Sequence, residues 1–206
     1  MIIKRYDSGL LLSNMYVIVE NEHAIVIDPC YDTSASEQFS IDYLMLTHEH
    51  YDHIFGVNKW KTRCKAPLLC SDICAQRIRN PRKNAARHFD VFCELQTMVD
   101  HWELRYFNPD FACYADITFS GTMHLKWQGH VFKLIHIPGH SPGSTGVFLD
   151  NNIFFSGDSL LEGRDIELRF PGGSKKLWEE TGKKVIESIP KGTLICPGHF
   201  KEFVLK

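Results

Sequence analysis

The sequence predicts a domain of the α/β (α+β) class, in which two groups of strands are combined with helices. One group of short β-branched and aromatic runs lies within residues 2–47 and a second within 117–155, with turn-forming residues between the runs. Near the end of the chain, Ser174 is placed to cap a helix over 175–188. The 206 residues, of which 44% are hydrophobic, are enough to bury one core, so we expect a single domain.

The first strand group is expected to begin as an antiparallel meander. Its predicted strands are 2–6, 15–20 and 24–28. A short helical segment over 33–40 then leads into a strand over 41–47. Asp28 closes the third strand, and two interpretations of it stay open. It either forms an ordinary Asp-Pro turn, or its carboxylate accepts a hydrogen bond from a metal-binding histidine.

The strand over 41–47 runs into a stretch rich in metal-binding side chains, T-H-E-H-Y-D-H. In an extended chain His48 and His50 point to the same side, so they can share one metal ion. Asp52 and His53 fall where the following segment becomes helical, so their side chains diverge from the first pair and can bind a second ion. A polar loop is the alternative, but three histidines and an aspartate at this spacing favour two metal ions.

Three further metal-binding side chains follow later strands in the same way. The predicted strands in this half are 117–119, 123–127, 131–137, 146–149, 153–155 and 193–196. His140 lies in a Pro-Gly loop after one of them and is the third imidazole expected at the first ion. Asp158 and His199 also lie at strand ends. His136 is part of a strand, so we expect a buried, hydrogen-bonded histidine there rather than a ligand.

Charge and composition exclude several classes of partner. The formal net charge of −2 gives no reason to expect nucleic acid, and no apolar run is long enough to span a membrane. The first residues show no signal-peptide pattern. The seven cysteines form no C-x-x-C pair, and Cys70 and Cys74 are expected to pack in the core rather than bind zinc. Reduced thiols are typical of the cytoplasm, so we expect a cytoplasmic protein.

A basic segment precedes an acidic one in the middle of the chain. Residues 59–88 hold nine Lys or Arg side chains and one acid, Asp72. The acids that follow are Asp90, Glu94, Asp100, Glu103, Asp110 and Asp116. Either the two segments neutralise each other, or cations such as Arg79, Arg82 and Lys83 hold a carboxylate or phosphate of a small anionic substrate. Aromatic residues expected to pack nearby are Trp102, Tyr106, Phe107, Phe111 and Tyr114.

The order of these motifs resembles that of the metallo-β-lactamase superfamily. The motifs are the Asp-Pro strand end, T-H-E-H-Y-D-H-x-x-G, P-G-H-S-P-G-S, S-G-D and a final P-G-H. The hydroxyacylglutathione hydrolase (glyoxalase II) branch is the most similar, without its C-terminal helical region. The resemblance implies an αββα sandwich, two mixed β-sheets flanked by helices, over residues 1–206. Within it, 59–116 would form a mainly helical insertion that walls the site.

The resemblance also implies a role for each motif residue. His48, His50 and His140 would bind the first metal ion, Asp52, His53 and His199 the second, and Asp158 would bridge both. Zn²⁺ suits these donors best, and Fe or Mn is compatible with them. A hydroxide that bridges the two ions would attack an ester, a thioester or a related small substrate. Asp52 would be the catalytic residue that orients the hydroxide and accepts its proton.

Two departures from the family pattern narrow the expected substrate. The class-B β-lactamases most often replace the residue that matches His53 and carry a cysteine where Asp158 stands, so β-lactams are not expected. The chain ends seven residues after His199, so the helical grip on glutathione is not expected either. The resemblance leaves one other function open, an iron-dependent oxidoreductase similar to the persulfide dioxygenases of this fold.

Overall fold

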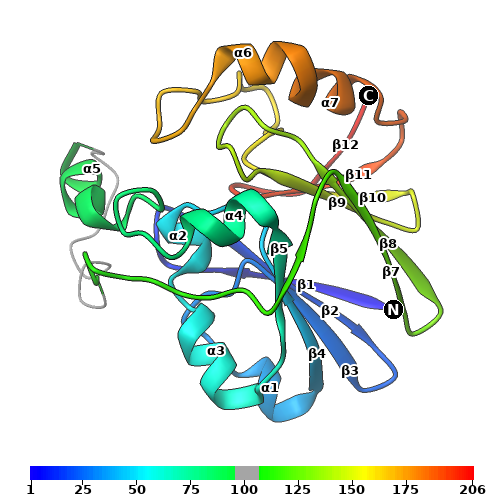
Figure 1. Cartoon of the computed structure of the whole chain (residues 1–206). Coiled ribbons are helices and arrows are strands. Elements are labelled where there is room, and N and C mark those ends of the chain that lie inside the picture. The colour runs from blue at the N-terminus through cyan, green and yellow to red at the C-terminus, as the bar shows by residue number, and fades with distance from the viewer. Residues whose placement is uncertain (96–106) are drawn as a thin grey trace.

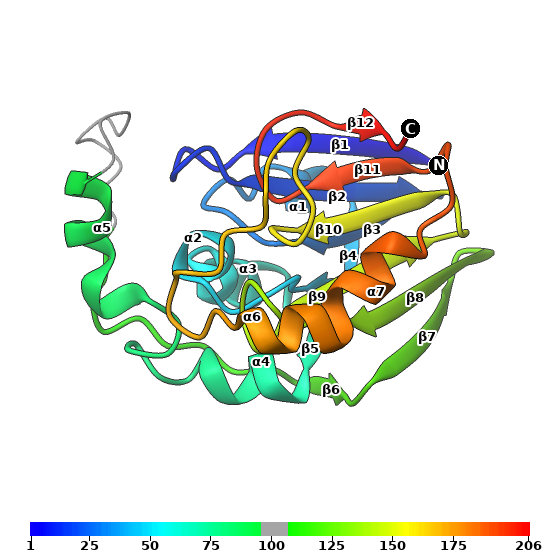
Figure 2. The same cartoon turned by 90° about the horizontal axis from the view of Figure 1, so that it is seen from above.

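Two six-stranded β-sheets face each other, with helices on the outer side of each, in the computed structural model (Figure 1, Figure 2). The structure describes residues 1–95 and 107–206. The first sheet has the order β1 (Ile2–Asp7), β2 (Asn14–Glu20), β3 (His23–Ile27), β4 (Ser40–Met45), β5 (Leu68–Ser71) and β6 (Ile117–Phe119). The second has the order β12 (Phe203–Val204), β11 (Leu194–Pro197), β10 (Ile153–Gly157), β9 (Thr145–Leu149), β8 (His130–His136) and β7 (Thr122–Trp127). The predicted αββα sandwich is confirmed.

The helices are short, and most of them connect strands of the first sheet. These are α1 (Ala35–Gln38), α2 (Tyr51–Ile54), α3 (Val57–Cys64), α4 (Asp72–Arg77), the 3₁₀ turn η1 (Ala86–His88) and α5 (Phe89–Leu95). One continuous helical segment covers the second sheet, made of α6 (Lys175–Leu177), the π-helical η3 (Trp178–Gly182) and α7 (Lys183–Glu187). Ser174 caps this segment as predicted, because its Oγ accepts a hydrogen bond from Leu177 N at 3.2 Å.

Alternation along the strands distributes the core over three apolar clusters. In β2, Met15 and Val17 face the helices and belong to one cluster with Trp60. Tyr16 and Ile18 point the other way and belong to the cluster between the two sheets. A third cluster lies between the outer face of the second sheet and α7. Because both faces of each central strand are covered, side chains at the strand ends are held in fixed positions.

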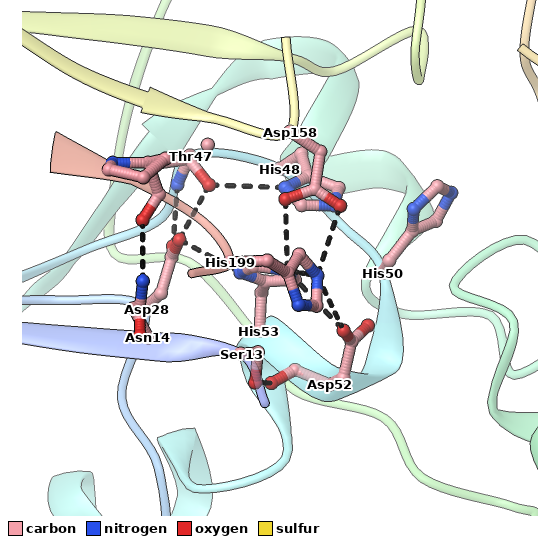
Figure 3. A network of polar contacts seen from close by, with 12 residues as sticks. Ser13, Asn14, Asp28, Thr47, His48, His50, Asp52, His53, Asp158 and His199 are labelled. Atoms are coloured by element: carbon pink, nitrogen blue, oxygen red, sulfur yellow. Dashed lines mark hydrogen bonds and ion pairs between the residues drawn. The ribbon is translucent and has the colours of Figure 1, made fainter. Parts of the chain in front are cut away.

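The carboxyl ends of central strands from both sheets meet at one edge of the sandwich. β3, β4 and β5 run parallel to one another, and so do β10 and β11. The residues that follow them therefore share an edge, with Asp28 and Thr47 from the first sheet and Asp158 and His199 from the second (Figure 3). The two halves are also joined directly here, since Thr145 N donates a hydrogen bond to Thr47 O at 2.7 Å.

Two strands differ from the sequence prediction. β5 lies inside 59–116, the segment predicted to be mainly helical, and both of its faces are buried, so it lacks the alternation that marks a half-exposed strand. β12 has only two residues and carries too little pattern to be recognised. The role of 59–116 as a wall of the site stays a prediction. Of the residues singled out above, Asp100, Trp102, Glu103 and Tyr106 lie outside the described ranges.

The cysteines and the helices agree with the predictions from composition. No disulfide bond is found among the described residues, and Cys70 and Cys74 are fully buried in the first apolar cluster. Within the described ranges, every helix is too short or too polar to cross a lipid bilayer.

Candidate metal centre

The stretch after β4 changes from extended to helical chain in the middle of the histidine motif. His50 still has an extended conformation, with φ −66° and ψ 147°, and α2 begins at the next residue. His48 and His50 therefore point together, whereas Asp52 and His53 project from the first turn of the helix. All four side chains are buried.

The first group of donors is formed by His48, His50 and His140, whose ring nitrogens lie within 4.8 Å of one another. His140 Nε2 and His50 Nδ1 are 2.9 Å apart. His48 Nε2 is buried without a hydrogen-bond partner. The remaining nitrogen of each ring has an acceptor: Thr47 Oγ1 at 3.1 Å from His48, Pro171 O at 3.4 Å from His50, and Glu167 O at 2.8 Å from His140. These contacts leave three nitrogen lone pairs directed at one point.

The second group is formed by Asp52, His53 and His199. His53 Nε2 and His199 Nε2 are 3.4 Å apart, and Asp52 Oδ2 is 3.4 Å from each of them. The outer nitrogens again have acceptors, since His53 Nδ1 contacts Asp28 Oδ2 at 3.0 Å and His199 Nδ1 contacts Leu11 O at 3.0 Å. The second group therefore also presents its donor atoms to a common point.

Asp158 lies between the two groups (Figure 3). Its Oδ2 is 3.4 Å from His140 Nε2 in the first group and 3.3 Å from His199 Nε2 in the second. Its Oδ1 is 3.5 Å from His53 Nε2 and is buried without a hydrogen-bond partner. Gly198 lies so close that a Cβ atom there would be 2.2 Å from Oδ1, so a larger residue would force the carboxylate to move. The carboxylate is thus placed to contact cations in both groups.

Asp28 supports both groups from behind. It accepts hydrogen bonds from Thr47 N at 2.7 Å, from Thr47 Oγ1 at 2.6 Å and from His53 Nδ1 at 3.0 Å (Figure 3). Because the Thr47 hydroxyl donates to Asp28, it can accept from His48 Nδ1, so the carboxylate orients one imidazole of each group. Asp28 also lies close to His48 and His53 as a third possible donor group, but its oxygens are already occupied by these hydrogen bonds. The hydrogen bond that the second interpretation of Asp28 expects is therefore present, and metal binding by His53 stays a prediction.

The buried carboxylates require positive charge nearby. Burial alone would raise the pKa of Asp158, but the neighbouring His199 and His53 outweigh it and hold that pKa well below its usual range. Burial opposes the charge on His53 as well, yet Asp52 and Asp158 raise its pKa to about 9. In the first group, burial and the adjacent His140 lower the pKa of His50 to about 3. A cation is favoured between the carboxylates, and neutral imidazole ligands are ready beside it.

Some cations of the basic segment pair with the acidic segment, and others are exposed. Arg87 pairs with Asp110 at 2.6 Å and Lys61 with Asp116 at 2.6 Å, as the neutralisation alternative predicts. Arg79 is exposed, with its guanidinium carbon 5.4 Å from the centre of the Tyr114 ring. The remaining two predicted substrate contacts are Arg82 and Lys83, which are exposed and have no ion pair among the described residues. Substrate contact by these three cations stays a prediction.

Two residues near the donors, Phe170 and Glu49, were not predicted from the sequence. Phe170 places its ring centre 6.0 Å from that of His50 and 5.9 Å from that of His140. Glu49 is fully buried and forms an ion pair with Arg77. A hint was available for Glu49, because an acid between two histidines of an extended stretch must face away from them into the protein. His136 hydrogen-bonds to a backbone carbonyl and belongs to none of the donor groups, as predicted, but it is only partly buried rather than buried.

Comparison with known proteins agrees with this geometry. The family model described as "Metallo-beta-lactamase superfamily" matches residues 8–199. The chain belongs to this superfamily. A hydroxyacylglutathione hydrolase, GloC, from Haemophilus influenzae is 26% identical to it over 196 residues, covering 87% of this chain and 81% of the relative. With the donor groups described above, this makes the chain a metal-dependent hydrolase of the superfamily.

Solved structures show the same fold. The BLEG-1 B3 metallo-β-lactamase superposes with a TM-score of 0.82 at 23% identity, over 98% of this chain and 94% of the other. The protein TTHA1623, solved in a di-iron-bound form, superposes with a TM-score of 0.72 at 23% identity, over the same shares of the two chains. At these identities the likeness establishes the arrangement of the sheets and leaves substrate and metal open.

Proposed function

We propose that the chain is a dinuclear metallohydrolase. His48, His50 and His140 would hold the first ion, Asp52, His53 and His199 the second, and Asp158 would bridge them. One observation carries the proposal: each of the five imidazoles is fixed by a hydrogen bond at one nitrogen and presents the other to its group. Two of the buried atoms without hydrogen-bond partners, His48 Nε2 and Asp158 Oδ1, would then each have a cation to bind.

The donor set supports Zn²⁺ as the resident ion. Imidazole nitrogen combined with carboxylate oxygen is a common zinc environment, and two ligand groups of this size leave positions open for water and substrate. Iron and manganese accept the same atoms, and the di-iron form of the similar structure is a precedent for iron on this fold. Metal analysis therefore has to be part of any test.

The chemistry follows from what the side chains can do around such ions. Two divalent ions would supply Lewis acidity and a water molecule whose pKa is lowered from 15.7 toward ~7. Asp52 is the proposed proton acceptor, because it stays ionised between His53 and His199, although burial alone would raise its pKa. Phe170 stands against the first group and would exclude water on that side. Hydrolysis of an ester, a thioester or a related small compound fits these roles.

The substrate is proposed to be small and anionic. Arg79, Arg82 and Lys83 are exposed cations in the segment between His53 and His140, and they would steer and hold a carboxylate or phosphate. Reduced thiols such as the buried Cys70 and Cys74 support a reducing, cytoplasmic environment.

A direct test starts from metal content. Protein purified without added metal is analysed for bound ions, stripped with a chelator, and reloaded with Zn²⁺, Fe²⁺ or Mn²⁺ before assay on thioesters, lactones and phosphodiesters. Two equivalents are expected for the wild type and one for His199→Ala, while His136→Ala, a histidine outside the groups, keeps two. Saturation of both the wild type and His199→Ala at a single ion would exclude a dinuclear centre.

The second candidate function is an iron-dependent oxidoreductase on the same donors. The di-iron form of the similar structure favours keeping it in the test. Oxygen consumption with a persulfide substrate by the iron-loaded protein, together with inactive zinc-loaded protein, would support it. Hydrolysis by the zinc-loaded protein without oxygen would exclude it as the main activity. In the hydrolysis assay with the zinc-loaded protein, Asp52→Ala should abolish most of the turnover.

A further inference from the structure

The carboxylate of Glu49 is buried in the middle of the histidine motif but points away from the metal donors. Glu49 lies between His48 and His50 in the extended stretch, so its side chain projects to the opposite side. It is fully buried. Its Oε2 accepts a hydrogen bond from Ser141 Oγ at 2.9 Å, and its Oε1 is 2.5 Å from Arg77 Nε. These last two atoms form an ion pair, although they are not aligned as a hydrogen bond.

The Glu49 carboxylate lies between the two loops that supply the first group of donors and contacts both. Ser141 follows His140 directly, so the hydrogen bond from its hydroxyl ties the loop of one ligand to the stretch that carries the other two. Gly143 packs against the same carboxylate, because a Cβ there would come within 2.4 Å of Oε2. A shift of Glu49 would therefore displace both loops.

Arg77 links Glu49 to the loop that covers the first group. One terminal nitrogen of its guanidinium donates to Lys83 O at 3.0 Å and to Pro171 O at 3.2 Å. Pro171 O is also the carbonyl that lies 3.4 Å from His50 Nε2. Gly172 packs on the guanidinium, since a Cβ there would be 2.6 Å from the same nitrogen. Arg77 thus contacts both neighbours of His50, its adjacent residue in the chain and its hydrogen-bond acceptor.

A gain in folding stability does not explain why Glu49 and Arg77 form a buried ion pair. A buried ion pair gains little over an apolar pair of the same size, because both charges lose their hydration. Arginine differs from lysine in offering several N–H groups in a fixed planar arrangement, so it can hold a carboxylate with one nitrogen and carbonyls with another. Arg77 contacts three partners in this way, the Glu49 carboxylate and the carbonyl oxygens of Lys83 and Pro171.

We propose that Arg77 is a positioning residue for the first metal ion. It acts through Glu49 and through Pro171, and so fixes His50 and the loop that carries Phe170 over the site. This inference rests on the proposed function insofar as it concerns a metal ion, while the effect on the loop exists in the metal-free protein as well.

The first arm of the test measures zinc binding at the first group alone. In a His199→Ala background, the Zn²⁺ affinity is determined by competition with a chromophoric chelator. Arg77→Lys is expected to weaken that affinity 10- to 100-fold, the usual effect of losing a group that orients a ligand. Arg87→Lys is the matched control, because Arg87 lies in the same segment but forms an exposed pair with Asp110, and it should change the affinity less than 2-fold.

The second arm separates positioning from a merely structural role. Glu49→Gln combined with Arg77→Met removes both charges and leaves side chains of similar size, so the melting temperature should return toward that of the parent. The first-site affinity should stay at least 10-fold weaker, because nothing then holds Pro171. If affinity and melting temperature recover together, Arg77 only balances a buried charge and the inference is wrong.

The third arm uses metal-free protein, so it does not depend on the proposed function. The amides of Gly173 and Ser174 are hydrogen-bonded to Phe170 O and Gly139 O, both at 2.8 Å. Arg77→Lys should speed hydrogen exchange of the peptide that contains these two amides by about 10-fold relative to Arg87→Lys. Unchanged exchange would overturn the inference. A wild type that binds no zinc would instead refute the proposed function, and this arm would still decide the role of Arg77.

Discussion

Asp28→Asn should weaken both metal groups at once, because one carboxylate orients an imidazole of each. Asp28 holds His53 directly and His48 through the Thr47 hydroxyl. An Asn side chain keeps the shape but presents an amide N–H₂ to at least one of three donors. The tautomer that directs His53 Nε2 at its group then loses its support, and Zn²⁺ affinity should fall about 10- to 100-fold.

The cost in stability can be worked from the same contacts. Three buried donors rely on Asp28, and leaving a buried donor without a partner costs roughly 1–3 kcal/mol. Asn should strand one of them, for a loss of about 1–3 kcal/mol, or roughly 2–12 °C in Tm for a domain of this size. Asp28→Ala strands all three donors, so its loss should exceed that of Asp28→Asn, and it puts alanine at φ 53°, a left-handed conformation that aspartate tolerates better.

The assay is a pair of measurements on each variant. Thermal unfolding of the chelator-treated protein reports the cost in stability, and zinc competition reports the affinity of each group. Asp32→Asn is the control, because Asp32 is exposed and accepts one local hydrogen bond from Ser34 N, so its change should stay within about 0.5 kcal/mol. If Asp28→Asn lowers the melting temperature but binds both zinc ions like the wild type, the carboxylate supports the fold only.

Three further predictions concern the site. Asp158→Ala should weaken both ions, because Oδ2 lies close to a histidine of each group, and calorimetric zinc titration should show both steps shifted. Gly198→Ala should reduce metal content to a similar extent, since its Cβ would meet Asp158 Oδ1 at 2.2 Å; full metal content measured by elemental analysis would contradict this. Neutralising Arg79, Arg82 and Lys83 together should raise KM for an anionic thioester at least 5-fold more than for a matched neutral one, with added salt giving the same trend in the wild type. Equal KM changes for the two substrates would leave these cations without a role in substrate binding.

The sequence was sufficient to predict that several candidate ligand residues come together, because they follow strand ends. His48, His140, Asp158 and His199 all come directly after buried runs that tight turns interrupt, and the structure gathers them at one edge of the sandwich. The second sheet apart from β12 was also predictable, since its hairpins carry clear turn signals. β5 was not, because a strand buried on both faces looks like any short apolar run.

Contacts between residues far apart in the chain could not be predicted from local sequence patterns. Arg77 belongs to a segment rich in cations, and its sequence neighbours give no sign that it alone turns inward to an acid of the histidine motif. Phe170 lies in a loop without periodicity, so its position over two imidazoles depends on hydrogen bonds such as that from His140 Nδ1 to Glu167 O. Such contacts are set by the folded chain as a whole.

The distribution of the donors along the chain has a consequence for biosynthesis. His50 and His140, in the first group, are 90 residues apart, and His53 and His199, in the second, are 146 apart. A nascent chain therefore cannot complete either group until most of it has left the ribosome, so metal loading comes late. Once bound, the ions would act as cross-links that close long loops, which are the cross-links that restrict the unfolded chain most in theory. Depletion of metal should consequently shorten the lifetime of the newly made protein, in addition to removing its catalytic activity.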